Sequence, residues 1–198
     1  ERSDSEACVT TDPTPRRRFF QEGLGRLLGP VVDYVQDRFG DERERPGLRP
    51  PGALPESAFL KTCYRCGRCV DACRPRAIAL IVHRHPDLDG TPVVDPDIAA
   101  CAVCEPLSCM GACPSGALRV VRREAIAMGM AVSPTADCLH RQGQTCTLCV
   151  DACPMHALAI STEPRNILVN AQRCVGCGMC RHVCPTRPRA IIVEPRQG

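Results

Sequence analysis

Short apolar runs of four to six residues recur along the chain from residue 77 onward. They span residues 77–82, 91–94, 117–121, 157–160, 166–169 and 190–193. Runs of this length, bounded by Pro, Gly and Asp, predict short β-strands. The order of strand, loop, short helix and strand is repeated along the chain. This repetition predicts antiparallel hairpins and two similar halves, and the predicted fold class is α+β.

The amino-terminal part has a different pattern, in which apolar residues recur at helical spacing between residues 16 and 39 with a break at Pro30. The apolar stripe consists of Phe19, Phe20, Leu24, Leu27, Leu28, Val31, Val32, Val35 and Phe39. We expect an amphipathic helix or a kinked pair of helices, which docks on the folded body, on a partner subunit or on a membrane surface. Residues 41–57 are rich in Pro and charge, and this composition predicts an extended linker.

The composition changes the picture of the interior. The chain has 17 Cys in 198 residues, but no Trp, 2 Tyr and 4 Phe. Aromatic packing therefore contributes little to the core. We expect cysteine-bound inorganic cofactors to occupy much of the interior and their insertion to be coupled to folding.

Sixteen of the cysteines fall into four groups with related spacing. The first two groups are Cys63, Cys66, Cys69 and Cys73, then Cys101, Cys104, Cys109 and Cys113. The last two are Cys138, Cys146, Cys149 and Cys153, then Cys174, Cys177, Cys180 and Cys184. Only the fourth group is an unmodified CxxCxxCxxxCP. The first has Arg74 before its Pro, the second has a longer middle loop and the third has a more distant first cysteine. The remaining cysteine, Cys8, has no partner motif.

This spacing is typical of ligands to 4Fe-4S clusters, because a CxxCxxC loop supplies three thiolates from one turn and a fourth comes from elsewhere. In two-cluster ferredoxins the last cysteine of each motif ligates the cluster of the other motif. We expect the first motif to pair with the second and the third with the fourth. A nested pairing of one with four and two with three is the alternative. Zinc knuckles leave the extra cysteines unused, and neighbouring thiols in CxxCxxC are poorly placed for disulfides.

The sequence thus predicts four 4Fe-4S clusters on these sixteen cysteines and a polyferredoxin that transports electrons. Four clusters of about −2 each would change the formal charge of +3 to about −5, so the arginines partly compensate cluster charge. We expect no nucleic-acid partner, because the arginines are interpreted as compensation of cluster charge and not as a nucleic-acid footprint, which would need a clustered basic face. We also expect no catalytic site, because every motif supplies four cysteines. An enzyme with an open iron site is a less favoured hypothesis.

The predicted organisation is an amino-terminal tail and helix (1–40), a linker (41–57) and two ferredoxin-like domains with two clusters each (58–122 and 123–198). The segments 48–54 and 63–69, with Glu56 and Phe59, resemble the NapG/MauM ferredoxin-type family, as do residues 112–118 and 127–132 and the widely spaced third motif. The resemblance covers about residues 48–195.

The resemblance implies a four-cluster carrier in a respiratory chain. It would relay electrons from a quinol-oxidising membrane ferredoxin-type protein toward a terminal oxidoreductase, such as a nitrate reductase or methylamine dehydrogenase system. A permanent relay subunit of a larger membrane-associated oxidoreductase is the alternative.

The location of the protein is a separate expectation. Residues 16–21 resemble a twin-arginine export signal, but charged residues interrupt the apolar stretch that should follow. We therefore expect a location on the cytoplasmic side, where the amino-terminal helix would allow membrane association. Periplasmic location by twin-arginine export is the alternative.

Overall fold

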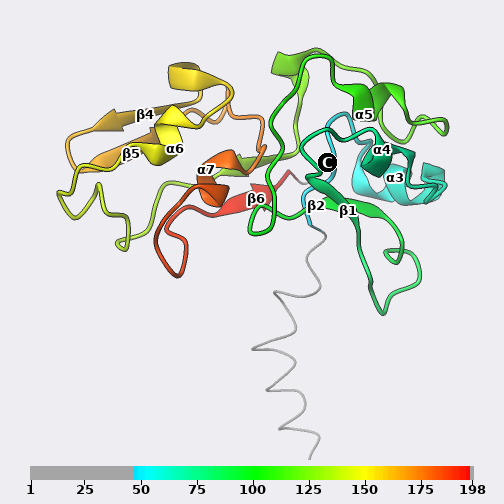
Figure 1. Cartoon of the computed structure of the whole chain (residues 1–198), viewed down its shortest axis with the longest axis horizontal. Coiled ribbons are helices and arrows are strands. Elements are labelled where there is room, and N and C mark those ends of the chain that lie inside the picture. The colour runs from blue at the N-terminus through cyan, green and yellow to red at the C-terminus, as the bar shows by residue number, and fades with distance from the viewer. Residues whose placement is uncertain (1–46, 197–198) are drawn as a thin grey trace, which may run out of the picture. The chain divides into compact units, whose positions relative to one another are not determined.

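The computed structural model describes residues 47–196 (Figure 1). Those residues belong to one compact unit, Pro46–Gly198. The predicted amphipathic helix at 16–39, Cys8 and residues 41–46 of the predicted linker lie outside the described residues. No helix within 47–196 has both the length and the apolar character needed to span a bilayer.

The described chain is built from short helices and short strands. The helices are α3 (Glu56–Thr62), α4 (Arg68–Asp71), α5 (Ser108–Gly111), α6 (Leu148–Asp151) and α7 (Met179–His182), with 3-10 turns η1 (Arg123–Ala125) and η2 (His156–Leu158). The strands are β1 (Ile78–Leu80), β2 (Pro92–Val94), β3 (Gly129–Ala131), β4 (Ile160–Glu163), β5 (Asn166–Val169) and β6 (Val193–Pro195). The mixture of short helices and antiparallel strands agrees with the α+β prediction.

Two predicted hairpins are confirmed. Strands β1 and β2 pair antiparallel with Ile78 opposite Val94, and β4 pairs with β5 with Ile160 opposite Val169. Ile78, Val94 and Ile160 are buried, whereas Leu80 at the far end of β1 is partly exposed. Each hairpin therefore directs the end nearest the cysteine motif into the core. In Figure 1 each hairpin lies beside its short helix, β1 with α4 and β4 with α6.

The remaining predicted strands differ from the structure. Residues 117–121 form only one bridge, Leu118 with Ala53, and residues 157 and 158 belong to η2. The run at 190–193 becomes a strand only at Val193. Strand β6 then pairs antiparallel with β3, from which it is separated by about sixty residues, instead of forming a local hairpin. Local apolar patterns carry no information about such distant partners.

The prediction of an extended linker is wrong for residues 47–57. Leu48 is buried and bridges to Val94, and Pro50 and Pro51 are fully buried. The Arg49 guanidinium forms an ion pair with Glu56, donates to Thr91 Oγ1 at 2.9 Å and lies 4.6 Å from the Phe59 ring centroid. A charged, Pro-rich segment resembles a linker in composition, but here the charge is buried with its partners satisfied.

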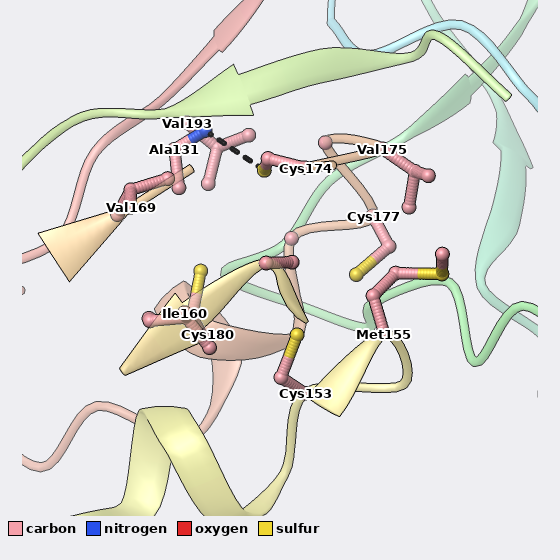
Figure 2. A pocket seen from close by; sticks show the side chains of 13 residues that line it. Ala131, Cys153, Met155, Ile160, Val169, Cys174, Val175, Cys177, Cys180 and Val193 are labelled. Atoms are coloured by element: carbon pink, nitrogen blue, oxygen red, sulfur yellow. Dashed lines mark hydrogen bonds between the residues drawn. The ribbon is translucent and has the colours of Figure 1, made fainter. Parts of the chain in front are cut away.

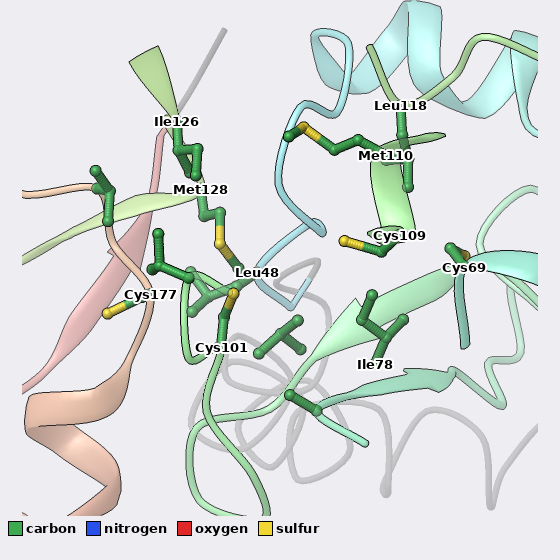
Figure 3. Close-up of a cluster of buried hydrophobic side chains, with 14 of the residues drawn as sticks. Leu48, Cys69, Ile78, Cys101, Cys109, Met110, Leu118, Ile126, Met128 and Cys177 are labelled. Carbon is green, nitrogen blue, oxygen red and sulfur yellow. The ribbon is translucent and has the colours of Figure 1, made fainter. Parts of the chain in front are cut away.

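The larger apolar cluster crosses the middle of the sequence. It contains Leu48, Phe59, Ile78, Met110, Met128 and Cys177 among others, and Figure 3 shows side chains from both predicted halves in contact around Leu48. A second cluster lies around Ile160, Ile167, Ala190 and Ile191. The boundaries at 58–122 and 123–198 stay predictions, but the buried core of residues 47–196 spans them.

Candidate iron-sulfur centre

Each cysteine motif is folded in the same way around a single helical turn. The third cysteine of each motif, Cys69, Cys109, Cys149 or Cys180, lies within α4, α5, α6 or α7 and is buried. The backbone N–H of the last cysteine donates to the carbonyl three residues earlier, at 3.1 to 3.2 Å. The chain therefore leaves each helix with the last cysteine held on its own short turn.

The first and second motifs are brought together, since α4 packs against α5. One cavity is lined by Cys101, Cys104 and Cys109 of the second motif and by Cys73, the last cysteine of the first. Burial, with the neighbouring Cys109, Cys104 and Cys73 thiols, raises the pKa of Cys101 to about 11. The last cysteine of the second motif lies near the first motif in turn. Burial and then Cys63 raise the pKa of Cys69 to about 11, with a further contribution from Cys113, the last cysteine of the second motif.

The third and fourth motifs show the same arrangement, and α6 packs against α7. A second cavity is lined by Cys174, Cys177 and Cys180 together with Cys153 of the third motif (Figure 2). Burial, followed by Cys138 and Cys146, raises the pKa of Cys149 to about 11. The last cysteine of the fourth motif, Cys184, packs in the same apolar cluster as Cys138 and Cys149. The structure therefore has the pairing of one with two and three with four, and the nested pairing is wrong.

The electrostatics of these cavities favour cofactor-bound thiolates over free ones. Burial raises the pKa of Cys177 to about 12 and that of Cys180 further still. A thiol in such apolar surroundings stays protonated unless a metal ion takes the proton's place, because a coordinated thiol is deprotonated outright.

Several of the motif cysteine sulfurs accept hydrogen bonds from backbone N–H groups. Ala77 N donates to Cys73 Sγ at 3.3 Å, Leu118 N to Cys113 Sγ at 3.4 Å and Ala131 N to Cys174 Sγ at 3.5 Å. The last of these bonds is the dashed line in Figure 2. Such donors stabilise negative charge on a ligating sulfur and so adjust the reduction potential of an iron-sulfur cluster.

The last cysteines of the second and fourth motifs each also have a hydroxyl group nearby. Ser115 Oγ lies 3.5 Å from Cys113 Sγ, and Thr186 Oγ1 lies 3.3 Å from Cys184 Sγ. Burial raises the pKa of each thiol, but these hydroxyls together with nearby backbone N–H groups outweigh it, so both pKa values are lowered. The corresponding positions after Cys73 and Cys153 are Pro75 and Met155, whose side chains have no hydrogen-bond donor.

Among the described residues, one backbone hydrogen bond joins the two motif pairs directly. Cys101 N donates to Cys177 O at 3.0 Å, and the Cys101 thiol contributes to the raised pKa of Cys177. These residues belong to the two four-cysteine cavities, which therefore lie next to each other in the fold.

Part of the chain matches a family model, and several known proteins match most of its length. Residues 144–187 match the model of the 4Fe-4S dicluster domain. The methylamine utilization ferredoxin-type protein MauM of Methylobacillus flagellatus is 34% identical over 196 residues, which cover 90% of this chain and 83% of that protein. The chain belongs to the MauM and NapG family of ferredoxin-type proteins. The ferredoxin-type protein NapG of Escherichia coli is 37% identical over 180 residues, which cover 82% of this chain and 78% of that protein. The MauM protein of Methylophilus methylotrophus is 38% identical over 193 residues, which cover 88% of this chain and 84% of that protein.

The donor set of this MauM/NapG family member fits 4Fe-4S clusters. Four sulfurs line each of the two cavities, and one of the four comes from the partner motif, as in two-cluster ferredoxins. Within residues 47–196 no three His, Cys, Asp or Glu side chains are grouped closely enough to hold one metal ion between them. The cysteines instead surround spaces lined by apolar side chains such as Ile160, Val175 and Val193.

The cysteine spacing alone did not predict the hydroxyl groups beside the sulfurs or the contact between the motif pairs. The hydroxyls had a visible signal, because Ser115 and Thr186 each stand two residues after the last cysteine, in Cys-Pro-Ser and Cys-Pro-Thr. The contact of Cys101 with Cys177 had none, since it joins two backbones.

Proposed function

We propose that the chain is an electron carrier that holds four 4Fe-4S clusters and passes electrons between two redox partners. The observation that carries this proposal is the exchange of last cysteines within each motif pair, which surrounds each of the two cavities with four sulfurs. When bound, a 4Fe-4S cluster accepts or releases one electron without forming or breaking covalent bonds in a substrate.

The sixteen cysteines would then form four ligand sets, each with three cysteines from one motif and the last cysteine of its partner. The first pair supplies Cys63, Cys66, Cys69 and Cys113, and Cys73, Cys101, Cys104 and Cys109. The second pair supplies Cys153, Cys174, Cys177 and Cys180, and Cys138, Cys146, Cys149 and Cys184.

The order of these sets along an electron path follows from the contacts. The set around Cys101 and the set around Cys177 are adjacent through the backbone bond between those two residues. The sets containing Cys66 and Cys146 are then the two ends, so the path does not follow the order of the motifs in the sequence. The buried side chains between the sets exclude water, and the N–H donors adjust the potentials.

The direction of the relay is part of the proposal. We infer that electrons come from a quinol-linked membrane partner and leave toward a terminal reductase or dehydrogenase system, with no catalytic site on this chain. Membership of the MauM and NapG family supports this assignment. Permanent incorporation in a membrane-associated oxidoreductase is the alternative arrangement, and native mass spectrometry of the protein isolated with its partners separates the two.

The location on the cytoplasmic side is also proposed, with export by the twin-arginine route as the alternative. Cell fractionation with a reporter fused after residue 198 tests it. Reporter activity in the periplasmic fraction would exclude the cytoplasmic assignment.

A reductive titration tests the relay function. Anaerobically prepared protein should take up about four electrons per chain from dithionite and return them to an oxidant with its visible spectrum restored. Cys104→Ser should lower the uptake, whereas Cys8→Ser should leave it unchanged. Irreversible reduction, or equal effects of the two substitutions, would contradict the proposal.

A further inference from the structure

Two of the four motifs carry a surplus of positive charge, the first and the fourth, but in the fourth Arg181 and Arg189 form ion pairs with Asp97. Residues 61–76 contain Lys61, Arg65, Arg68, Arg74 and Arg76 but only one acidic residue, Asp71, and so carry +4. The whole chain carries +3, which means that the remaining residues together carry −1. The third motif, at the other end of the proposed path, has one Arg and one Asp in residues 138–153 and is neutral.

The same segment brings a cysteine to the surface. Among the sixteen motif cysteines, all of which the structure describes, Cys66 is the one in the exposed class, and the others are buried or intermediate. Tyr64, two residues before it, is 71% exposed. Lys61, Arg65 and Arg68 are exposed as well. We call the exposed residues Lys61, Tyr64, Arg65, Cys66 and Arg68 the Cys66 face.

The side chains of the Cys66 face are available to a partner. Arg65 is held in place, because its guanidinium donates to the carbonyls of Asp87 at 2.9 Å and Pro86 at 3.4 Å in the loop between β1 and β2. Among the described residues, Lys61 and Arg68 have no ion pair or side-chain hydrogen bond. The face thus offers one fixed cation, two free cations and an aromatic ring around an accessible cysteine.

We propose that the Cys66 face is the docking surface for a redox protein with an acidic surface. This inference rests on the proposed electron-carrier function and identifies one end of the path. Complementary charge steers partners and fixes their orientation. An acidic partner is attracted to this segment and not to the neutral third motif, so its redox centre arrives beside Cys66. The exposed Tyr64 supplies the aromatic contact that protein interfaces favour.

A matched pair of variants tests the docking surface in the full-length, cluster-loaded protein. Lys61→Gln with Arg68→Gln removes two positive charges from the Cys66 face. Gln144→Glu with Thr145→Glu changes the net charge by the same amount at the third motif, where both side chains are exposed. The probe is an acidic plant-type 2Fe-2S ferredoxin, whose Kd is measured by anaerobic biolayer interferometry at low and at physiological salt.

If the Cys66 face is the docking surface, three binding results are expected. The wild-type protein binds the ferredoxin at low salt and more weakly at physiological salt. The Lys61/Arg68 variant binds roughly three- to tenfold more weakly at low salt, as expected for two exposed charge pairs. The Gln144/Thr145 variant binds like the wild type.

Three results would overturn it: no binding to the wild type at low salt, equal weakening in both variants, or binding to anionic phospholipid vesicles but not to the ferredoxin. Electron uptake is measured on every sample. Normal electron uptake in a Lys61/Arg68 variant that binds the ferredoxin as tightly as the wild type would contradict the docking surface alone. Absent electron uptake in the wild type would contradict the electron-carrier function itself.

Discussion

Asp97 and Arg181 form a two-point ion pair between segments 84 residues apart. Arg181 donates from Nε to Oδ1 at 3.0 Å and from Nη2 to Oδ2 at 2.8 Å. Arg189 Nε lies 3.0 Å from the same Oδ1, and the neighbouring His182 ring is 3.0 Å from Pro96 O. Asp97 precedes the second motif and Arg181 lies in the fourth. The pair therefore joins the two halves near the contact of Cys101 with Cys177.

Replacing Asp97 by Asn should loosen this junction. The Asp97 side chain is 47% exposed, so solvent screens the ion pair. We expect the substitution to lower the free energy of unfolding by about 1 kcal/mol at neutral pH. The hydrogen bonds and charge of Arg181, with Arg189, hold the pKa of Asp97 below its ordinary value. A carboxyl group with a lowered folded-state pKa stabilises the protein above the unfolded-state pKa of about 4, and this contribution is lost as the pH falls through the folded-state value.

The measurement is the thermal midpoint of cluster-loaded protein at a fixed scan rate, because loss of a cofactor makes unfolding irreversible. Asp71→Asn is the control, since it removes the same charge from an exposed residue with no ion pair in the described part of the chain. The difference between the two variants should be largest at neutral pH and disappear in acid. A difference that grows in acid would contradict the assignment.

The Thr186 hydroxyl should raise a reduction potential. Its oxygen accepts the Ala190 N–H at 2.9 Å, which leaves its own hydrogen to point at Cys184 Sγ. Thr186→Val keeps the shape but removes this donor. A net hydrogen-bond energy of about 1 kcal/mol corresponds to a few tens of millivolts for a one-electron couple.

We expect one potential to fall by that amount in an EPR-monitored redox titration, and Ser115→Ala to lower a different one. Thr145→Val is the control, because Thr145 is adjacent to Cys146 but its hydroxyl has no hydrogen bond to a described residue. An unchanged set of potentials in both hydroxyl variants would show that these hydroxyls do not act on the ligating sulfurs.

Gly176 should be far less replaceable than Gly67, although both have positive φ, 69° and 74°. A Cβ on Gly176 would lie 2.2 Å from the backbone of Gly129 in β3, whereas one on Gly67 would meet no atom within 4 Å. Both Ala variants bear the left-handed strain, but only Gly176→Ala pushes the fourth motif away from β3. We expect Gly176→Ala to lose visible absorbance per chain during purification and Gly67→Ala to keep most of it. Equal retention would mean that β3 moves freely.

The sequence was sufficient for features that depend on local spacing. The hairpins at Ile78 and Ile160 and the preferred motif pairing follow from short repeated patterns, and the sixteen cysteine ligands stay a prediction from the same patterns. Features that depend on distant partners were out of reach. Strand β3 pairs with β6, which lies far away in the sequence. Asp97 forms an ion pair with Arg181, and no sequence motif marks either residue. The prediction of a linker failed at residues 47–57 for a different reason. A charged residue such as Arg49 suggests an exposed segment, but its side chain is buried and donates to Thr91 and to the Pro92 carbonyl.

The metal content of anaerobically purified protein tests the central claim most directly. Iron and acid-labile sulfide should each be about 16 per chain, with interacting low-temperature EPR signals after reduction by dithionite. About 8 of each, or stoichiometric zinc, would contradict four clusters and would mean that the second and third motifs do not bind 4Fe-4S centres.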